Sequence, residues 1–409
     1  MRAELATAIS NRSNLALFLL AQMISRFGDP ITLIALAAAV FRLTGSALLT
    51  SAAVLVATVP QASVGFFGGA IADAVGHRRA MVLSDVARAL FVAIIPAALS
   101  MPEYSLAAAF ALAALAGLCG AIFNPARVAI VPTLAPKAQL SAVNSLIHGT
   151  DRAVEIAGAV AAGILVASVG DAAFYIDAAT FGASALILSR ISVSEGPARS
   201  VSASDLWSDA RFGLGFLRRS RVLFPNTVVS VMAQLSLPVA NGLLPVLIFR
   251  RFSGFDTALG AQRFGLAEAA LAAGAIAMGA LLLRRFTGGI PKGHLVLIGW
   301  AMYGALLLGI AVAPTFEVLL LMLALLGAAN VLFFVPNVTI SQEATPASLR
   351  ARVFGARMSL MSLSWLPTML LAGALADHVD VSLLIGVAGA FTIVVALVAT
   401  QIRAVADVP

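Results

Sequence analysis

The chain has 409 residues, of which 61% are hydrophobic and only 11% are charged, whereas roughly a quarter of the residues in a soluble globular protein are charged. This composition, with a mean hydropathy of +1.00, excludes a soluble enzyme and predicts an integral membrane protein. The net charge of +7 does not indicate nucleic-acid binding, because the basic residues lie between apolar segments and not on one polar face.

Charge clusters, prolines and glycines divide the chain into twelve apolar segments, each long enough to cross a bilayer with about 20 residues. We expect all of them to be α-helices, because lipid offers no partners to an open sheet edge. The sequence therefore predicts an all-α membrane protein with twelve transmembrane helices. The predicted spans are residues 14–40, 47–72, 80–100, 104–126, 141–168, 171–190, 222–249, 258–283, 294–313, 316–340, 353–376 and 381–402.

The distribution of Lys and Arg indicates the topology, since cytoplasmic loops collect these residues. Odd-numbered loops hold only Arg42, Arg250 and Arg251. The even-numbered loops and both termini hold all other basic residues outside the spans, Arg127 among them. We therefore expect both termini in the cytoplasm.

One long hydrophilic stretch, residues 191–221, separates six spans from six. Within it, Leu206, Ala210 and Leu217 share one face of an amphipathic helix that would lie at the lipid interface. A solvated tether is the alternative. The sequence predicts an N-terminal six-helix bundle at 1–190, a cytoplasmic linker at 191–221 and a C-terminal six-helix bundle at 222–409.

An internal repeat supports this division into halves. The segment PARVAIVPTLAPKAQLSAVNSL, which starts at Pro125, is echoed by PNVTISQEATPASLRARVFGARMSL, which starts at Pro336. Two pseudo-symmetric halves are typical of secondary transporters, which rock about a central site.

The loop after the second span carries a motif, GGAIADAVGHRRAMVLSDVARAL. Its spacing resembles the loop 2-3 signature of the major facilitator superfamily. The resemblance implies a conformational latch, in which the glycines allow a tight turn and the charged residues tie spans 2 and 3 to span 11. The predicted latch residues are Gly69, Asp73, Gly76, Arg78, Asp85 and Arg88.

Four further segments resemble the drug-exporter branch of that superfamily, which contains macrolide and enterobactin exporters. They are SRFGD from Ser25, FRLTGSAL from Phe41, LSDVARAL from Leu83 and NPARVAIVPTLAPKAQLSAVNSL from Asn124. The resemblance implies antiport by alternating access, with the substrate site between two bundles.

Charged residues inside spans are informative, because each costs about 2.5 to 3.5 kcal/mol at a helix centre. Gln22, Arg26 and Asp29 fall on one face of span 1. In span 5 a polar stripe contains His148, Asp151 and Glu155, with Arg152 beside it.

An acid beside a movable arginine can load and release a proton when helices rearrange. The predicted proton-coupling residues are Asp29, Asp151, Glu155, Arg26 and Arg152. The alternative is that these residues form permanent ion pairs that hold the bundle together. Asp177 and Glu268 also lie in spans and could titrate instead.

Several polar and aromatic side chains are candidates for a substrate cavity. Amides can bind a substrate, although they bond a neighbouring helix just as readily. The predicted cavity residues are Gln22, His148, Gln234, Asn241, Asn330, Phe334 and Asn337.

We expect a monomeric, multi-pass protein of a bacterial inner membrane that exports an amphiphilic small molecule (a drug, a macrolide or a siderophore-like compound) against protons or another coupling ion. ATP is excluded as the direct energy source, because the chain has no Gly-rich loop ending in Gly-Lys-Ser/Thr. A lipid or lysolipid flippase of the same fold is the alternative. The sequence carries no motif of a membrane-embedded enzyme and predicts no cofactor or metal.

Overall fold

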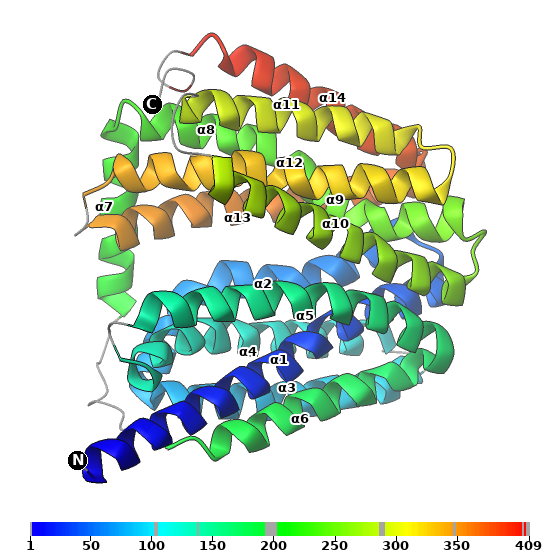
Figure 1. Cartoon of the computed structure of the whole chain (residues 1–409). Helices are drawn as coiled ribbons and strands as arrows, with labels where there is room; N and C mark the ends of the chain where they lie inside the picture. Colours follow the sequence, from blue (N-terminus) through cyan, green and yellow to red (C-terminus); the bar gives the residue numbers. More distant parts are fainter. Residues whose placement is uncertain are drawn as a thin grey trace. The chain divides into compact units, whose positions relative to one another are not determined.

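The computed structural model describes residues 2–101, 105–136, 139–192, 203–285, 291–346, 349–402 and 405. Every regular element in these residues is a helix (Figure 1), which confirms the predicted all-α class. The chain forms two compact units: one contains residues Met1–Ala39 and Val56–Val201, and the other contains Val40–Leu55 and Ser202–Pro409. We call them unit 1 and unit 2.

Unit 1 is built mainly from six helices with short connections. In chain order they are α1 (Arg2–Thr44), α2 (Ala47–Val75), α3 (His77–Leu99), α4 (Ser105–Leu134), α5 (Leu140–Val169) and α6 (Ala173–Ser189), with a 3-10 turn at Gly170–Ala172 before α6. The last turns of α1 and the first turns of α2 belong to unit 2. The predicted N-terminal bundle included those turns, but they pack with the second half of the chain.

Unit 2 contains the remaining helices. They are α7 (Ala203–Arg219), α8 (Leu223–Gln234), α9 (Ser236–Leu247), a π-helix at Ile248–Phe252, α10 (Thr257–Arg285), α11 (Lys292–Ala311), α12 (Phe316–Glu343), α13 (Arg350–Ala376) and α14 (Val381–Ala399). The predicted seventh span is therefore a broken helix, since α8, α9 and the π-helix follow one another almost directly.

Nine stretches of the described residues are long and apolar enough to cross a bilayer, and one of them, Leu146–Ser189, contains both α5 and α6. Shorter apolar stretches lie in α2 and α13, at Ala47–Val56 and Ser364–Ala376. Because one of the nine stretches contains two helices, and α2 and α13 each add one shorter stretch, the described residues are consistent with twelve spans.

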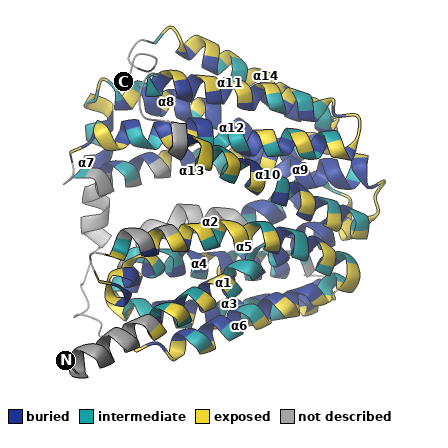
Figure 2. Ribbon diagram, in the orientation of Figure 1, coloured by how far each residue is buried: buried dark blue, intermediate teal, exposed yellow. Residues whose placement is uncertain are grey.

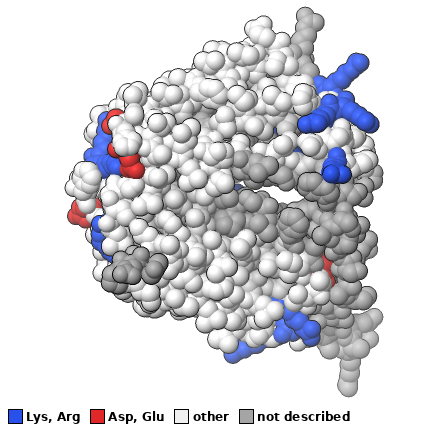
Figure 3. Space-filling model, turned by 180° about the vertical axis from the view of Figure 1, so that it is seen from behind, with Lys and Arg blue, Asp and Glu red and all other residues white. Residues whose placement is uncertain are grey.

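The surface of the protein suits a lipid environment. Along the helices, exposed and buried residues alternate (Figure 2), and exposed positions include large apolar side chains such as Leu186 and Leu90, which are 66% and 59% exposed. In Figure 3 the charged side chains gather in a few patches, and most of the visible described side chains are neutral. Such a surface is stable against acyl chains and not in water.

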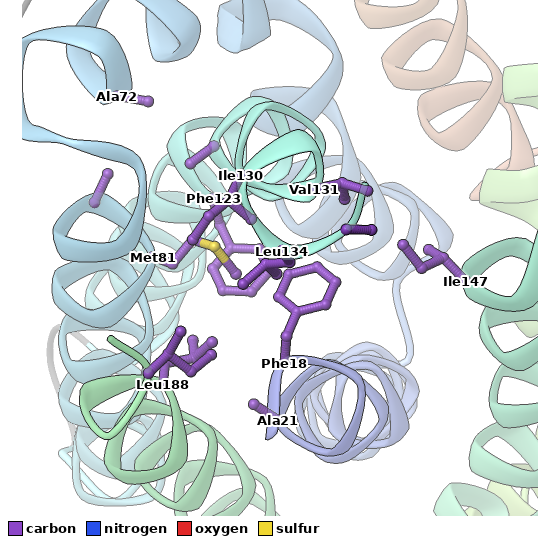
Figure 4. Packing of buried hydrophobic residues seen from close by; sticks show 14 of the residues in the cluster. Phe18, Ala21, Ala72, Met81, Phe123, Ile130, Val131, Leu134, Ile147 and Leu188 are labelled. Atoms are coloured by element: carbon purple, nitrogen blue, oxygen red, sulfur yellow. The ribbon is translucent and has the colours of Figure 1, made fainter. Parts of the chain in front are cut away.

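The core of unit 1 lies where α1, α3, α4 and α6 meet (Figure 4). Phe18, Met81, Phe123, Leu134 and Leu188 are almost completely buried there. Lipid tails are as apolar as these side chains, so dispersion contacts between well-fitted surfaces, and not transfer from water, hold the helices together. This close packing fixes the rotation of each helix and thereby decides which polar residues face one another.

In unit 2, aromatic stacking joins α11 to α12. The rings of Trp300 and Phe333 stack with centroids 3.7 Å apart at an angle of 15°. Tyr303 meets the rings of Trp300 and Phe333 edge-on, with centroids 6.2 and 5.8 Å away. Aromatic pairs of this kind contribute about 0.5 to 1.5 kcal/mol beyond their burial.

The hydrophilic stretch does contain a helix, α7, and it packs against α13. Leu217, which was predicted to face lipid, is buried beside Val353 and Ala356 of α13. The apolar face of α7 therefore binds protein at its C-terminal end. The side chains of Leu206 and Ala210 lie outside the described residues.

Candidate functional site

Asp29 is the centre of a partly buried group of charged side chains in unit 1. It lies in α1, and its carboxylate accepts a hydrogen bond from Arg88 of α3. Arg26, one turn earlier in α1, approaches the other carboxylate oxygen at 3.5 Å and donates to Asn124 of α4 at 3.0 Å. Two guanidinium groups thus share one carboxylate, and the predicted Arg26 and Asp29 pair is present.

Arg88 is held from three sides. Besides Asp29, it lies 3.9 Å from Asp85, one turn away in α3, and its guanidinium sits over the ring of Phe181 in α6 at 3.8 Å. Arg88 is only 7% exposed and Asp85 is 0% exposed. A charge in such surroundings persists only where opposite charges and ring faces compensate its desolvation.

Asp177 of α6 completes this group. It is wholly buried and accepts hydrogen bonds from Thr32 of α1 and, at 3.1 Å, from Thr180 of its own helix. Gly28 permits this approach, because a Cβ at that position would overlap Asp177 Oδ1 and Thr180 Oγ1. We call Asp29, Asp85, Arg88 and Asp177 the acidic cluster.

Asp85 and Arg88 were predicted to belong to the latch, and that role stays a prediction. They lie in α3 about 10 and 15 Å beyond Arg78, counted at 1.5 Å per residue, inside the acidic cluster and not in the turn.

The turn itself holds the other predicted latch residues. Gly76 adopts φ +95°, a conformation that disfavours side chains, and so makes the sharp turn between α2 and α3. Asp73 lies 3.8 Å from His77, and Arg78 donates to the Ser189 carbonyl at the end of α6 at 3.1 Å. A Cβ on Gly69 would make only ordinary contact, 3.7 Å from Pro125. A tie from this turn to the eleventh span stays a prediction.

A second polar group joins α1, α4 and α5. Asp151 accepts hydrogen bonds from Gln22 and, at 2.8 Å, from Arg127. Arg127 was assigned to a cytoplasmic loop, but it lies within α4. The prediction from sequence also missed it as the partner of Asp151, because α4 continues well past the end predicted from hydropathy.

The remaining residues of the predicted span 5 stripe are exposed. Glu155 bonds Arg152 at 2.6 Å, and their side chains are 48% and 58% exposed. His148 is also exposed. The stripe therefore divides: Asp151 points to a protein partner, while His148 and Glu155 lie on the surface of unit 1.

Unit 2 has its own buried charge, Arg357 of α13, which is 4% exposed. Its guanidinium donates to Asn226 of α8 at 2.8 Å and to Ser230 at 3.2 Å, and it also bonds Asn337 and Ser341 of α12. No acidic side chain is among the partners that the described residues give Arg357. We call this group the arginine cluster.

The predicted cavity residues of unit 2 divide in the same way. Asn337 belongs to the arginine cluster, where it also donates to Ser230 at 2.7 Å, so it bonds neighbouring helices. Gln234 is buried at the end of α8. Asn241 and Phe334 are exposed, and Asn330 is half-buried. The last three can reach a molecule outside the unit.

A further ionic contact in unit 2 lies outside the predicted spans. Asp377, just after α13, accepts hydrogen bonds from Ser46 Oγ at 2.8 Å and from the first backbone N–H groups of α2, at Ala47 and Leu48, at 2.6 and 3.3 Å. Arg250 lies 3.4 Å from the same carboxylate. Burial alone would raise the pKa of Asp377, but these hydrogen bonds and the arginine lower it below its ordinary value.

Comparison with known proteins agrees with this architecture. Residues 18–293 match the family described as the Major Facilitator Superfamily. The multidrug efflux pump Tap of Mycolicibacterium fortuitum is 28% identical over 90% of this chain and 90% of its own. The MFS-type transporter YfiS of Bacillus subtilis is 27% identical over 95% of this chain and 93% of its own.

Solved structures show the same fold at low identity. A POT family transporter in complex with 5-aminolevulinic acid superimposes with a TM-score of 0.76 at 13% identity, covering 95% of both chains. The nucleoside transporter NupG gives a TM-score of 0.74 at 14% identity, covering 95% of this chain and 99% of its own. From its family match, its full-length relatives and its helical fold, the chain belongs to the major facilitator superfamily of membrane transporters.

Proposed function

We propose that this protein is a proton-coupled exporter of an amphiphilic small molecule, working by alternating access in a bacterial inner membrane with both termini in the cytoplasm. The relatives named multidrug efflux pumps support export of a drug-like compound. The observation that carries the proton coupling is Asp29, which binds two arginines on neighbouring helices inside unit 1.

Protonation of Asp29 would change the forces between helices. The ionised carboxylate binds Arg88 of α3 and Arg26 of its own helix, so it fastens α1 to α3. A neutral carboxyl gives up most of that attraction, and the arginines must find other partners. One proton therefore biases the relative position of two helices, which is the requirement for coupling proton movement to a conformational change.

The available energy is sufficient. One proton that crosses about 100 mV and one pH unit supplies about 3.7 kcal/mol, enough for a gradient of roughly 500-fold in a neutral substrate. The substrate would contact the amide and aromatic groups that remain accessible on unit 2, namely Asn241, Asn330 and Phe334. Their mixture of amides and an aromatic ring favours an amphiphilic compound.

The test uses purified protein in liposomes, with efflux of a fluorescent drug driven by an imposed pH gradient. We expect Asp29→Asn to abolish gradient-driven transport while exchange of substrate at equal concentrations persists. Glu317→Gln is the control, because that acid lies in the first turn of α12 and is exposed. Gradient-driven efflux by Asp29→Asn at the wild-type rate would contradict the proposal.

The same assay ranks the other proposed carriers. Asp151→Asn and Glu155→Gln each remove one carboxylate that has an arginine partner, half-buried in the first case and exposed in the second. If the carboxylate carries the proton, its variant loses gradient-driven transport only. If the carboxylate only holds helices together, its variant loses exchange and thermal stability as well as gradient-driven transport.

A further inference from the structure

Asp85 has the poorest set of hydrogen-bond donors in the acidic cluster. It is 0% exposed, and its Oδ1 atom has only distant neighbours, Ser25 Oγ at 3.5 Å and Arg88 at 3.9 Å. Its Oδ2 atom has no hydrogen-bond partner among the described residues. A buried carboxylate with so few donors is strongly disfavoured, whereas a protonated carboxyl needs only one acceptor.

An acceptor is available on α6. Ser184 lies beside Asp85, and its hydroxyl is also buried without a partner among the residues that the structure describes. The Ser184 hydroxyl can donate to the ionised carboxylate, and a protonated Asp85 can instead donate to Ser184 Oγ, so this neighbour serves either state, while the other lone pairs of an ionised carboxylate stay without a close donor. Leaving them unpaired would cost about 1 to 3 kcal/mol for each group.

The charge balance points to the same residue. In the described residues, three carboxyl groups, Asp29, Asp85 and Asp177, face two guanidinium groups, Arg26 and Arg88. The neighbouring Arg127 is balanced by its own partner, Asp151, and leaves this count unchanged. One proton makes this set neutral. Asp29 has both arginines as direct partners and is the best-stabilised carboxylate.

Asp177 also has closer hydrogen-bond donors than Asp85. Its Oδ2 atom accepts a direct hydrogen bond from Thr32, and its Oδ1 atom lies 3.1 Å from the Thr180 hydroxyl, which it shares with the Asp177 backbone carbonyl at 2.7 Å. Cys119 of α4, the other titratable group near Arg88 and Asp85, is a neutral thiol in its ordinary state. The proton therefore belongs on the carboxyl that lacks donors.

The two carboxyls next to Arg88 differ in access. The Asp29 side chain is 24% exposed, whereas the Asp85 side chain is fully buried. Both face the same guanidinium, so a small rotation of Arg88 exchanges one partner for the other. When Arg88 moves from Asp29 to Asp85, Asp85 gives up its proton and Asp29 accepts one, and the net charge of the set does not change.

We propose that Asp85 stores the coupled proton in this conformation and that Asp29 is the group through which the proton enters and leaves. The inference rests on the proposed proton-coupled transport and assigns the storage site to a residue that the loop motif had placed in a latch. Arg88 is the positioning residue that decides which of the two carboxyls is ionised.

Infrared spectroscopy of purified protein in lipid nanodiscs locates the proton without any transport. The C=O stretch of a protonated carboxylic acid is distinct from carboxylate bands, and we expect it near neutral pH in the wild type and in Asp177→Asn. It should disappear in Asp85→Asn and change frequency in Ser184→Ala, which leaves every charge in place. A band that survives in Asp85→Asn, or disappears in Asp177→Asn, would overturn the assignment.

Transport measurements then connect the site to coupling. With the membrane potential collapsed, one pH unit can support a substrate gradient of about tenfold for one exchanged proton. We expect Asp85→Asn to build no substrate gradient, so that the concentrations on the two sides stay about equal (a ratio of about 1). Exchange of substrate at equal concentrations should continue. Tenfold accumulation by Asp85→Asn refutes proton storage at Asp85 alone, whereas tenfold accumulation by Asp29→Asn refutes the coupling proposal itself. If Asp85→Asn does not fold, the frequency change in Ser184→Ala decides.

Discussion

The acidic cluster of unit 1 and the arginine cluster of unit 2 compensate a buried guanidinium group in different ways. Each places a guanidinium almost completely out of contact with solvent inside a helical unit, Arg88 at 7% and Arg357 at 4% exposure. Arg88 is compensated by carboxylates and an aromatic ring. Arg357 is compensated by the neutral oxygens of two asparagines and two serines.

The difference decides what each cluster can do. Carboxylates change charge when they bind a proton, so the partners of Arg88 can be rearranged by protonation. Amides and hydroxyls do not titrate in the physiological range, and the hydrogen bonds of Arg357 therefore stay fixed. The acidic cluster can therefore be rearranged by a proton, whereas the arginine cluster connects α8, α12 and α13 permanently.

The largest expected effect comes from removing each arginine in turn. Arg88→Met takes the shared guanidinium away from Asp29, Asp85 and Asp177 and should lower the free energy of unfolding by about 3 to 5 kcal/mol. Arg357→Met leaves only neutral groups unsatisfied and should cost about 1 to 3 kcal/mol. Thermal unfolding in detergent measures both. Equal losses would contradict the distinction between the clusters.

A second change should rescue the first in unit 1. Asp29→Asn added to Arg88→Met removes a carboxylate that has lost one of its two arginines, and we expect about 0.5 to 3 kcal/mol of stability to return. Asp29→Asn added to Arg357→Met is the control, because these residues share no described partner and their effects should add. Simple additivity in both pairs would show that Asp29 and Arg88 are not energetically coupled.

Packing around the acidic cluster offers a smaller test. Gly28→Ala forces Asp177 and Thr180 aside and should destabilise the protein by about 1 to 3 kcal/mol. Gly182→Ala in α6, where a Cβ meets nothing within 4 Å, is the matched control and should be neutral or slightly stabilising. Unfolding curves that coincide for the two variants would mean that Gly28 is not tightly packed.

The smallest expected effect concerns Asp377, a carboxylate at the end of a helix and outside the spans. Because its pKa in the folded protein lies below its ordinary value, its contribution is present above pH 4 or so and is lost as the pH falls through the lowered pKa. We expect wild-type stability to fall between about pH 5 and 3 by roughly 0.3 to 1 kcal/mol more than that of Asp377→Asn. Identical pH profiles would exclude this capping interaction.

Much of this arrangement could be read from local sequence. The Arg26 and Asp29 pair was predicted because the residues lie one helical turn apart, and the Arg152 and Glu155 pair has the same spacing. Arg357 was not singled out, because a lone arginine in a span does not indicate which neighbours surround it. Its signal would have been an unbalanced charge facing asparagines in two other spans.

Hydropathy, charge distribution and motif spacing therefore determined the class of the protein: a helical membrane transporter of the major facilitator superfamily. These properties are local, since a span depends only on its own length and composition. Only the tertiary structure brought Asp85, Arg88 and Asp177 to Asp29, joined Arg127 to Asp151 and assigned residues Val40–Leu55 to unit 2. Those contacts depend on how each helix is rotated and how far it extends, and packing between helices sets both.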